Sequence, residues 1–275
     1  FVEVAYFTQQ NGQKALGQLK VMSFASDEVP LLCTLDEPGY VKTFERVASG
    51  LASSMQKASA AAAPAYREIQ IIKLGEQPLG FQRDEYAKTK DGGMAQASSS
   101  TMFLTIGKTT IRSLDTGGAI VLDKAGRISE RRYVRVENGE IALQVILKRE
   151  NGNDYTVQGK QKGAPLSAKF STKDKAGLPG DPLIAQLTKA YLKGKAKELK
   201  VEQFSPSESL TAVTEATLRR DSSRTNGVEI TIGQLTVHGT VDEAGATDEV
   251  NAQLGENQIT QKRIFKEGAL PTYGK

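Results

Sequence analysis

Alternating apolar and polar positions dominate the chain and predict a fold made mostly of strands. Residues 139–148, GEIALQVILK, place apolar side chains at a strict period of two, at Ile141, Leu143, Val145 and Leu147. This period is typical of an antiparallel strand with one buried face. Shorter runs of the same kind, such as REIQIIK at 67–73, recur along the chain. We therefore expect an α+β fold, mostly β, in which repeated hairpins build one or more curved antiparallel sheets with a few helices on one side.

Glycine-containing turns separate the expected strands. Asn-Gly pairs at 138–139 and 226–227 tolerate the positive φ angles of a type I′ hairpin turn. Residues 123–126 and 242–245 both read Asp-x-Ala-Gly after an apolar strand residue, which predicts a short hairpin loop with glycine in the left-handed conformation. The alternation also changes parity at Gly233, and this predicts a β-bulge.

Two segments, Gly12–Gly17 and Gly75–Gly80, share the pattern G-x-x-x-L-G. A phosphate-binding loop of the Walker or dinucleotide type leads into a helix, whereas strand-like residues follow both of these segments. We therefore interpret them as the bends of two similar hairpins, with Leu16 and Leu79 facing the core.

Two helices are expected among the strands, at residues 40–56 and 180–194. The second has Asp181 as its N-cap, Pro182 at its first helical position and Gly194 just past its end. A long mobile loop is expected at residues 88–100, which are rich in glycine and serine.

A run of small residues ending at Pro64 indicates a domain boundary. It separates an N-terminal hairpin-plus-helix module, residues 1–64, from a main antiparallel β domain, residues 65–275, unless the two form one continuous fold. The chain begins at Phe1 rather than at a methionine, so we expect it to be a piece of a longer protein.

Composition excludes several classes of function. The 36 basic and 32 acidic residues give a net charge of +4 and are interspersed, unlike the clustered basic face of a nucleic-acid-binding protein. No apolar run reaches the roughly eighteen residues of a transmembrane helix. A single cysteine, Cys33, and a single histidine, His238, exclude an intrachain disulfide and a Cys- or His-rich metal site. We expect no cofactor and no metal.

The sequence offers no convincing set of catalytic residues. Cys33 lies in an apolar run, and His238 lies on the polar side of a predicted strand, although a Cys33–His238 dyad stays open. Asp84 and Glu85 are expected to point to opposite faces of one strand, and Asp242 and Glu243 lie in a turn. We therefore expect a protein that is not an enzyme.

One strand carries a candidate binding face. Residues Arg127, Arg131, Tyr133 and Arg135 share one strand parity. Their guanidinium groups suit phosphate, carboxylate or an anionic glycan. The alternative is a solvated outer strand face whose charges are balanced by neighbouring glutamates. The partners that fit the first interpretation are another protein, an anionic glycan or a lipid headgroup; the oligomeric state is open.

The hairpin motifs carry a resemblance. The G-x-x-x-L-G bends, the two V/L-D-x-x-G hairpins and a short helix before residues 199–219, LKVEQFSPSESLTAVTEATLR, occur together. Over residues 66–263 the chain resembles the β-rich extracytoplasmic domain that precedes the transglutaminase-like core in some bacterial secreted proteins. It is also similar to periplasmic half-barrel proteins. The resemblance implies a fold and a location in the periplasm or at the cell surface of a bacterium, and no reaction.

These observations favour a non-enzymatic extracytoplasmic bacterial module for binding or assembly. One alternative is the non-catalytic domain of a transglutaminase- or peptidase-like protein that acts with a catalytic partner. The other is a carrier that holds an apolar small molecule in the concavity of its sheet. The ligand itself is not encoded in any motif that we recognise.

Overall fold

A computed structural model describes residues 2–10, 13–22, 31–35, 64–106, 110–206, 208–254 and 257–274, together with the single residues 42 and 46. Contacts divide the chain into two compact units, Phe1–Ala61 and Ala62–Lys275. The boundary expected after residue 64 lies close to this division. The two units are described separately.

The first unit contains an antiparallel sheet of three strands in the order β1-β2-β3. The strands are β1 (Val2–Gln10), β2 (Gln13–Met22) and β3 (Leu31–Leu35). The first G-x-x-x-L-G segment crosses from the β1–β2 connection into β2, where Leu16 pairs with Phe7. The expected hairpin is therefore present. The helix expected at 40–56 lies outside the described residues except for Lys42 and Arg46, which are helical.

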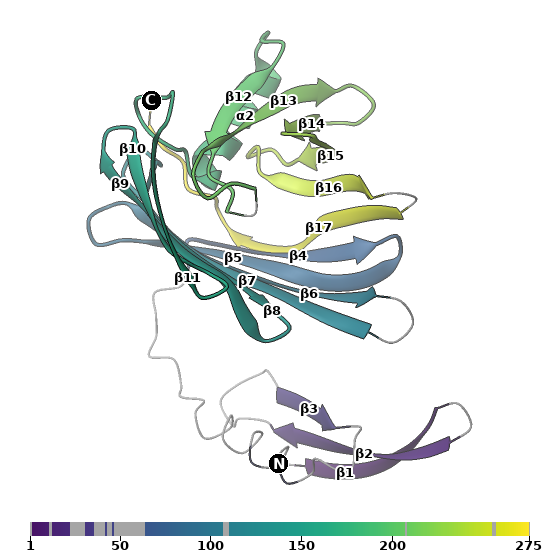
Figure 1. Ribbon diagram of the computed structural model, residues 1–275. Helices are drawn as coiled ribbons and strands as arrows, with labels where there is room; N and C mark the ends of the chain where they lie inside the picture. The colour runs from purple at the N-terminus through teal and green to yellow at the C-terminus, as the bar shows by residue number, and fades with distance from the viewer. Residues whose placement is uncertain are drawn as a thin grey trace. The chain divides into compact units, whose positions relative to one another are not determined.

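The second unit is a curved antiparallel sheet of 14 strands (Figure 1). Its order is β11-β10-β9-β8-β7-β6-β5-β4-β17-β16-β15-β14-β13-β12, so all neighbours follow each other in sequence except β4 and β17. The strands are β4 (Tyr66–Leu74), β5 (Gln77–Lys88), β6 (Met94–Ile106), β7 (Thr110–Leu122), β8 (Ile128–Glu137), β9 (Glu140–Asn151), β10 (Asp154–Gln161), β11 (Ala164–Ser171), β12 (Leu199–Gln203), β13 (Thr214–Asp221), β14 (Gly227–Ile232), β15 (Leu235–Val241), β16 (Thr247–Leu254) and β17 (Asn257–Gly268). This architecture confirms the expected fold class.

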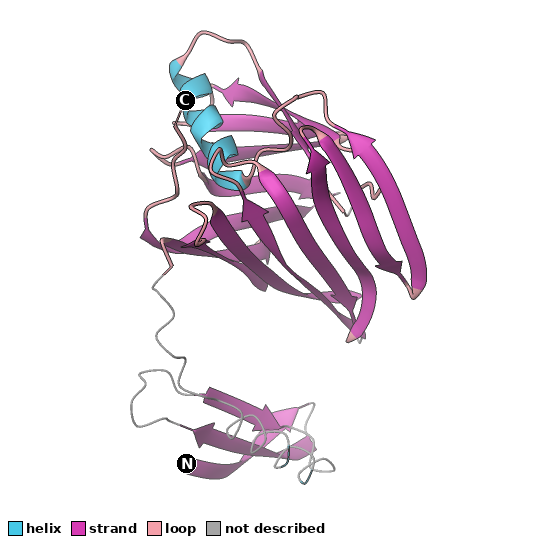
Figure 2. Ribbon diagram, turned by 90° about the vertical axis from the view of Figure 1, so that its left-hand side faces the viewer, coloured by secondary structure: helices cyan, strands magenta, loops and turns pink. Residues whose placement is uncertain are grey.

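Helix α2 (Asp181–Lys193) lies against the inner side of this curved sheet (Figure 2). Gly180 is its N-cap, without a side-chain capping bond, and the backbone N–H of Gly194 closes its end on Ala190 and Tyr191. The helix is where the sequence predicts it, but the assignment of Asp181 as N-cap is wrong. Asp181 is the first helical residue, where its charge complements the positive end of the helix dipole. Among the described residues, no helix is long and apolar enough to cross a bilayer.

The main hydrophobic core extends over the inner face of the sheet from β4 to β10. The side chains of Leu143, Val145 and Leu147 on β9 are fully buried, as the alternation predicts. Ile141, the fourth residue of that pattern, is instead 60% exposed. A register shift between Arg135 and Val136 pairs Val136 with Ile141, and this irregularity reverses the faces at the hairpin end.

The turns follow the sequence closely. Asn138 and Gly139 both have positive φ angles, 52° and 83°, as a type I′ turn requires. In the two Asp-x-Ala-Gly loops, Gly126 and Gly245 adopt φ angles of 77° and 85°. A Cβ atom on Gly245 would lie 2.1 Å from the carbonyl oxygen of Ala185, so the second loop packs against α2 only because it has glycine there.

Two expectations about irregular segments are wrong. Residues 88–100 are not a long loop, because Met94–Ile106 forms β6 and pairs with β5 and β7 along its length. Its small polar residues are held by partners across the strands, as in the Ser100–Thr116 hydrogen bond of 2.7 Å. Gly233 is not in a bulge either. With φ at 58° it lies in the tight turn between β14 and β15, which changes strand parity in the same way as a bulge does.

Candidate functional site

The inner side of the second unit encloses a cavity of about 350 Å³ between α2 and the sheet. One wall comes from β12 to β16 and is apolar; six of its residues are Val201, Ala216, Leu218, Val228, Ile230 and Val250. The other wall comes from β4, β5 and β17 and is polar. A volume of this size falls within the range of roughly 300–1,000 Å³ that is typical of small-molecule sites.

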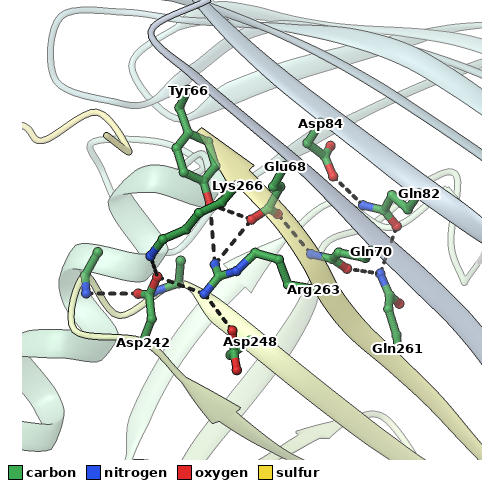
Figure 3. Close-up of polar contacts among 12 residues, drawn as sticks. Tyr66, Glu68, Gln70, Gln82, Asp84, Asp242, Asp248, Gln261, Arg263 and Lys266 are labelled. Carbon is green, nitrogen blue, oxygen red and sulfur yellow. Dashed lines mark hydrogen bonds and ion pairs between the residues drawn. The ribbon is translucent and has the colours of Figure 1, made fainter. Parts of the chain in front are cut away.

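A chain of hydrogen-bonded amides runs along the polar wall (Figure 3). Gln70 on β4 donates to Glu68 at 2.9 Å and accepts from Gln261 on β17. The same Gln261 amide donates to Gln82 on β5 at 3.0 Å, and Gln82 donates to Asp84 at 2.7 Å. Each buried amide thus has a partner, and the chain crosses the β4–β17 seam of the sheet.

Arg263 on β17 neutralises the Glu68 end of this chain. Its Nη1 atom lies 3.3 Å from Oε2 of Glu68, and its Nη2 atom lies 2.9 Å from Asp242 and 2.8 Å from Asp248. Lys266 adds a 2.9 Å bond to Asp242. Burial raises the pKa of Asp242, but the Lys266 hydrogen bond and the two positive charges outweigh it, so this pKa lies below its ordinary value.

The opposite end of this row of hydrogen-bonded amides contains two carboxylates that accept from the same side-chain amide. Nε2 of Gln96 on β6 donates to Oδ1 of Asp84 at 3.2 Å and to Oδ2 of Asp181 at 3.0 Å. Asp84 is 4% exposed and Gln96 is 3% exposed, whereas Asp181 is exposed. Burial raises the pKa of Asp84, and the negative charge of Asp181 adds to the rise, although hydrogen bonds from Gln82, Ser98 and Gln96 oppose it.

Apart from Asp84, Asp181 and Asp242, none of which was expected to bind a ligand, the residues of this site were not singled out from the sequence. Asp84 and Glu85 do point to opposite faces, as expected, but Asp84 is the buried one, while Glu85 pairs with Arg83 at 2.5 Å. A pattern that could have revealed the polar wall is present on β4. There the inner positions Glu68 and Gln70 are polar, and the intervening Ile69 and Ile71 are apolar, which is the reverse of an ordinary half-buried strand.

The structure separates the four residues of the arginine face. Arg131, Tyr133 and Arg135 on β8 pair with Leu147, Val145 and Leu143, so they lie on the core side and not on a solvated outer face. Arg127 precedes the strand, and its Nη1 atom binds Asp174 and the Gly177 carbonyl oxygen, each at 2.6 Å.

Each of these arginines has a hydrogen-bond or ion-pair partner within the chain. Arg131 donates to the Phe204 carbonyl oxygen at 2.7 Å, and burial lowers its pKa while the charge of Asp181 opposes the shift. Arg135 forms an ion pair of 3.0 Å with Glu137. Binding of an anionic partner at this face stays a prediction.

The other residues considered from the sequence include His238, Cys33 and Asp242. His238 is exposed on β15, where its Nδ1 atom lies 3.2 Å from Oδ2 of Asp221. Cys33 lies in β3 of the first unit, and its side chain is outside the described residues. Asp242 accepts backbone N–H groups in its turn, as expected of a turn carboxylate, and also binds Arg263. In the described part of the chain, no group of three or more His, Cys, Asp or Glu side chains is placed to hold a metal ion.

Comparison with known proteins supports the fold. No protein-family model matches the chain, and no curated protein matches it. Among solved structures, the chain is similar to the beta-barrel-like protein of domain of unknown function DUF1849 from Brucella abortus, with a TM-score of 0.55 and 12% sequence identity. The likeness covers 74% of this chain and 98% of that one. It shows a shared β-barrel-like fold. The resemblance to the domain that precedes transglutaminase-like cores stays a prediction.

Proposed function

We propose that the second unit is a non-enzymatic binding module that holds a small molecule with an apolar body in the cavity between α2 and the sheet. The carrier alternative from the sequence thus becomes the preferred form of the binding hypothesis. The observation that carries it is the division of one cavity into an apolar wall on β12–β16 and a polar wall on β4, β5 and β17. Such a cavity suits a ligand with an apolar body and a polar end.

The polar wall favours binding over catalysis. Among the described residues that line the cavity there is no histidine, cysteine or serine, so the Ser–His and Cys–His pairs of nucleophilic catalysis are not present there. Asp84 and Asp181 are the pair of carboxylates most like a catalytic pair, and both accept a hydrogen bond from the Gln96 amide. This amide fixes the position of both carboxylates, which can then accept hydrogen bonds from a ligand.

Binding of the neutral fluorescent probe N-phenyl-1-naphthylamine tests this function. We expect saturable binding with an increase in fluorescence, because an apolar probe leaves water for the apolar wall. The variant Ala216→Phe fills the cavity and should lose this binding. The variant Thr217→Phe is the matched control, because the neighbouring strand position points to the opposite face of the sheet. Equal binding by both variants, or no saturable binding by the natural chain, would reject the proposal.

We further propose that the module acts in the periplasm or at the surface of a bacterium. The hairpin motifs support this location through their resemblance to extracytoplasmic domains, and a protein of similar fold comes from the bacterium Brucella abortus. Fractionation of cells that express the complete natural gene product would test it. Recovery in the cytoplasmic fraction alone would contradict this part of the proposal.

A further inference from the structure

The two ends of the polar wall differ in their balance of charge. At one end, Glu68, Asp242 and Asp248 surround Arg263, and Lys266 adds a second positive charge. At the other end, neither Asp84 nor Asp181 forms an ion pair with a basic side chain among the residues that the structure describes. The charged residues that line the cavity are all acidic: Glu68, Asp84 and Asp181. Among the described residues, no basic side chain lines the cavity at the Asp84–Asp181 end.

Hydrogen-bond acceptors also exceed donors at this end. The amide of Gln96 bonds to both carboxylates through Nε2. Its Oε1 atom is buried and has no hydrogen-bond partner among the residues that the structure describes. A buried unpaired acceptor is costly, and such atoms in a native structure call for a missing donor. Two carboxylates and one amide oxygen provide acceptors for several donor hydrogens.

The residues around Asp84 and Asp181 restrict the chemical class of the missing hydrogen-bond donor. The positive charge of Arg131 acts on Asp181, but its guanidinium donates to the Phe204 carbonyl oxygen and does not line the cavity. A divalent metal is disfavoured, because the described residues include no group of three or more metal-ligating side chains. An anion at the N-terminus of α2 would meet the carboxylate of Asp181, which already compensates the dipole there. The chain as a whole carries a net charge of +4, so a preference for cations must arise locally.

We propose that the cavity selects amphipathic ligands with a protonated amine, whose ammonium group binds the carboxylates of Asp84 and Asp181. An ammonium group has three donor hydrogens and a positive charge, which matches both shortages at this end. The apolar body of the ligand lies along the wall of β12–β16, and exposed Asp181 leaves the polar end accessible to solvent. This inference rests on the proposed function and specifies its ligand class.

Displacement of N-phenyl-1-naphthylamine by octylamine, 1-octanol and octanoate tests the inference. These three competitors have similar alkyl chains and differ in the head group. We expect octylamine to displace the dye at concentrations roughly tenfold to a hundredfold lower than octanol, the size of effect of one charge-assisted hydrogen bond or more. Octanoate should be the weakest. Asp84→Asn should remove most of the preference for octylamine over octanol.

Asp248→Asn is the matched control, because Asp248 lies at the Arg263 end and does not line the cavity. This variant should keep the preference for octylamine. Equal displacement by octylamine and octanol, or an unchanged preference in Asp84→Asn, would overturn the amine inference while leaving the proposed function intact. Failure of the dye itself to bind would instead reject the proposed function.

Discussion

Nε2 of Gln96 lies 3.0 Å from Oδ2 of Asp181 and joins strand β6 to the first turn of helix α2, residues 85 positions apart in the chain. The same atom lies 3.2 Å from Oδ1 of Asp84 on β5. One buried amide thereby places two carboxylates at the polar end of the cavity. Bringing two like charges together and burying one of them costs free energy, and such arrangements occur more often at functional sites than elsewhere.

The first prediction concerns the stability cost of Asp84. Its pKa is raised above the ordinary value of 3.8, mainly by burial. The folded state therefore binds this proton more tightly than the unfolded state, and the resulting stability is present below about pH 3.8 and is lost as the pH rises through the folded pKa. Asp84→Asn should be more stable than the natural chain at pH 7, and this advantage should disappear near pH 4. Urea unfolding at both pH values measures it. At each pH, the quantity to compare is the free energy of unfolding of the variant minus that of the natural chain. A smaller difference at pH 7 than at pH 4 would contradict the assignment.

The second prediction concerns Arg263, whose side chain is 5% exposed among three carboxylates. Arg263→Met leaves Glu68 without its ion pair and Asp242 with Lys266 alone, and we expect a loss of about 3–5 kcal/mol in the free energy of unfolding at pH 7. The pKa of Asp242 is lowered in the folded state, so its contribution is present above pH 3.8 and is lost as the pH falls below that value. The deficit of the variant should therefore shrink in acid.

Arg132→Met is the control for this experiment. Arg132 pairs with Glu130 at 2.7 Å, but its side chain is 67% exposed. Exposed pairs contribute about 0–1 kcal/mol, so this variant should unfold nearly as the natural chain does. Similar losses in both variants would show that the Arg263 cluster does not stabilise the β4–β17 seam.

The third prediction concerns the second G-x-x-x-L-G segment. Gly75 has a φ angle of 56° in the β4–β5 turn, and Leu79 at the start of β5 is 6% exposed. Leu79→Ala should lower the free energy of unfolding by about 2–5 kcal/mol, because it leaves a cavity in packed surroundings. Ile141→Ala, at an exposed position of a similar hairpin, should cost much less. Denaturant titration compares the two, and a neutral Leu79→Ala would contradict the role given to this leucine.

Local features of the fold could be predicted from the sequence because short-range physics determines them. The alternation on β9 identifies Leu143, Val145 and Leu147 as buried, and the Asn138–Gly139 pair specifies its turn. Gly233 misled the prediction because a tight turn and a bulge produce the same change of parity. The serines of β6 misled it because their cross-strand partners are provided by β5 and β7, which the local composition does not reveal.

The candidate site could not be predicted because it depends on long-range pairing. Its polar wall exists only because β17 pairs with β4, which places Gln261 beside Gln70 across 191 positions of sequence. The core-facing position of Arg131 has a similar origin, since the carbonyl of Phe204 that receives its hydrogen bond lies 73 positions away. No local pattern in the sequence distinguishes such an inward arginine from one on a solvated strand face.

A crystal structure of the protein with bound octylamine tests the central claim most directly. We predict that the amine nitrogen lies within about 3.2 Å of a carboxylate oxygen of Asp84 and one of Asp181, the distance of a charge-assisted hydrogen bond. The alkyl chain should contact Ala216 and Leu218 on the apolar wall. An octylamine molecule bound outside the cavity, or bound inside it with the nitrogen turned away from both carboxylates, would contradict the account.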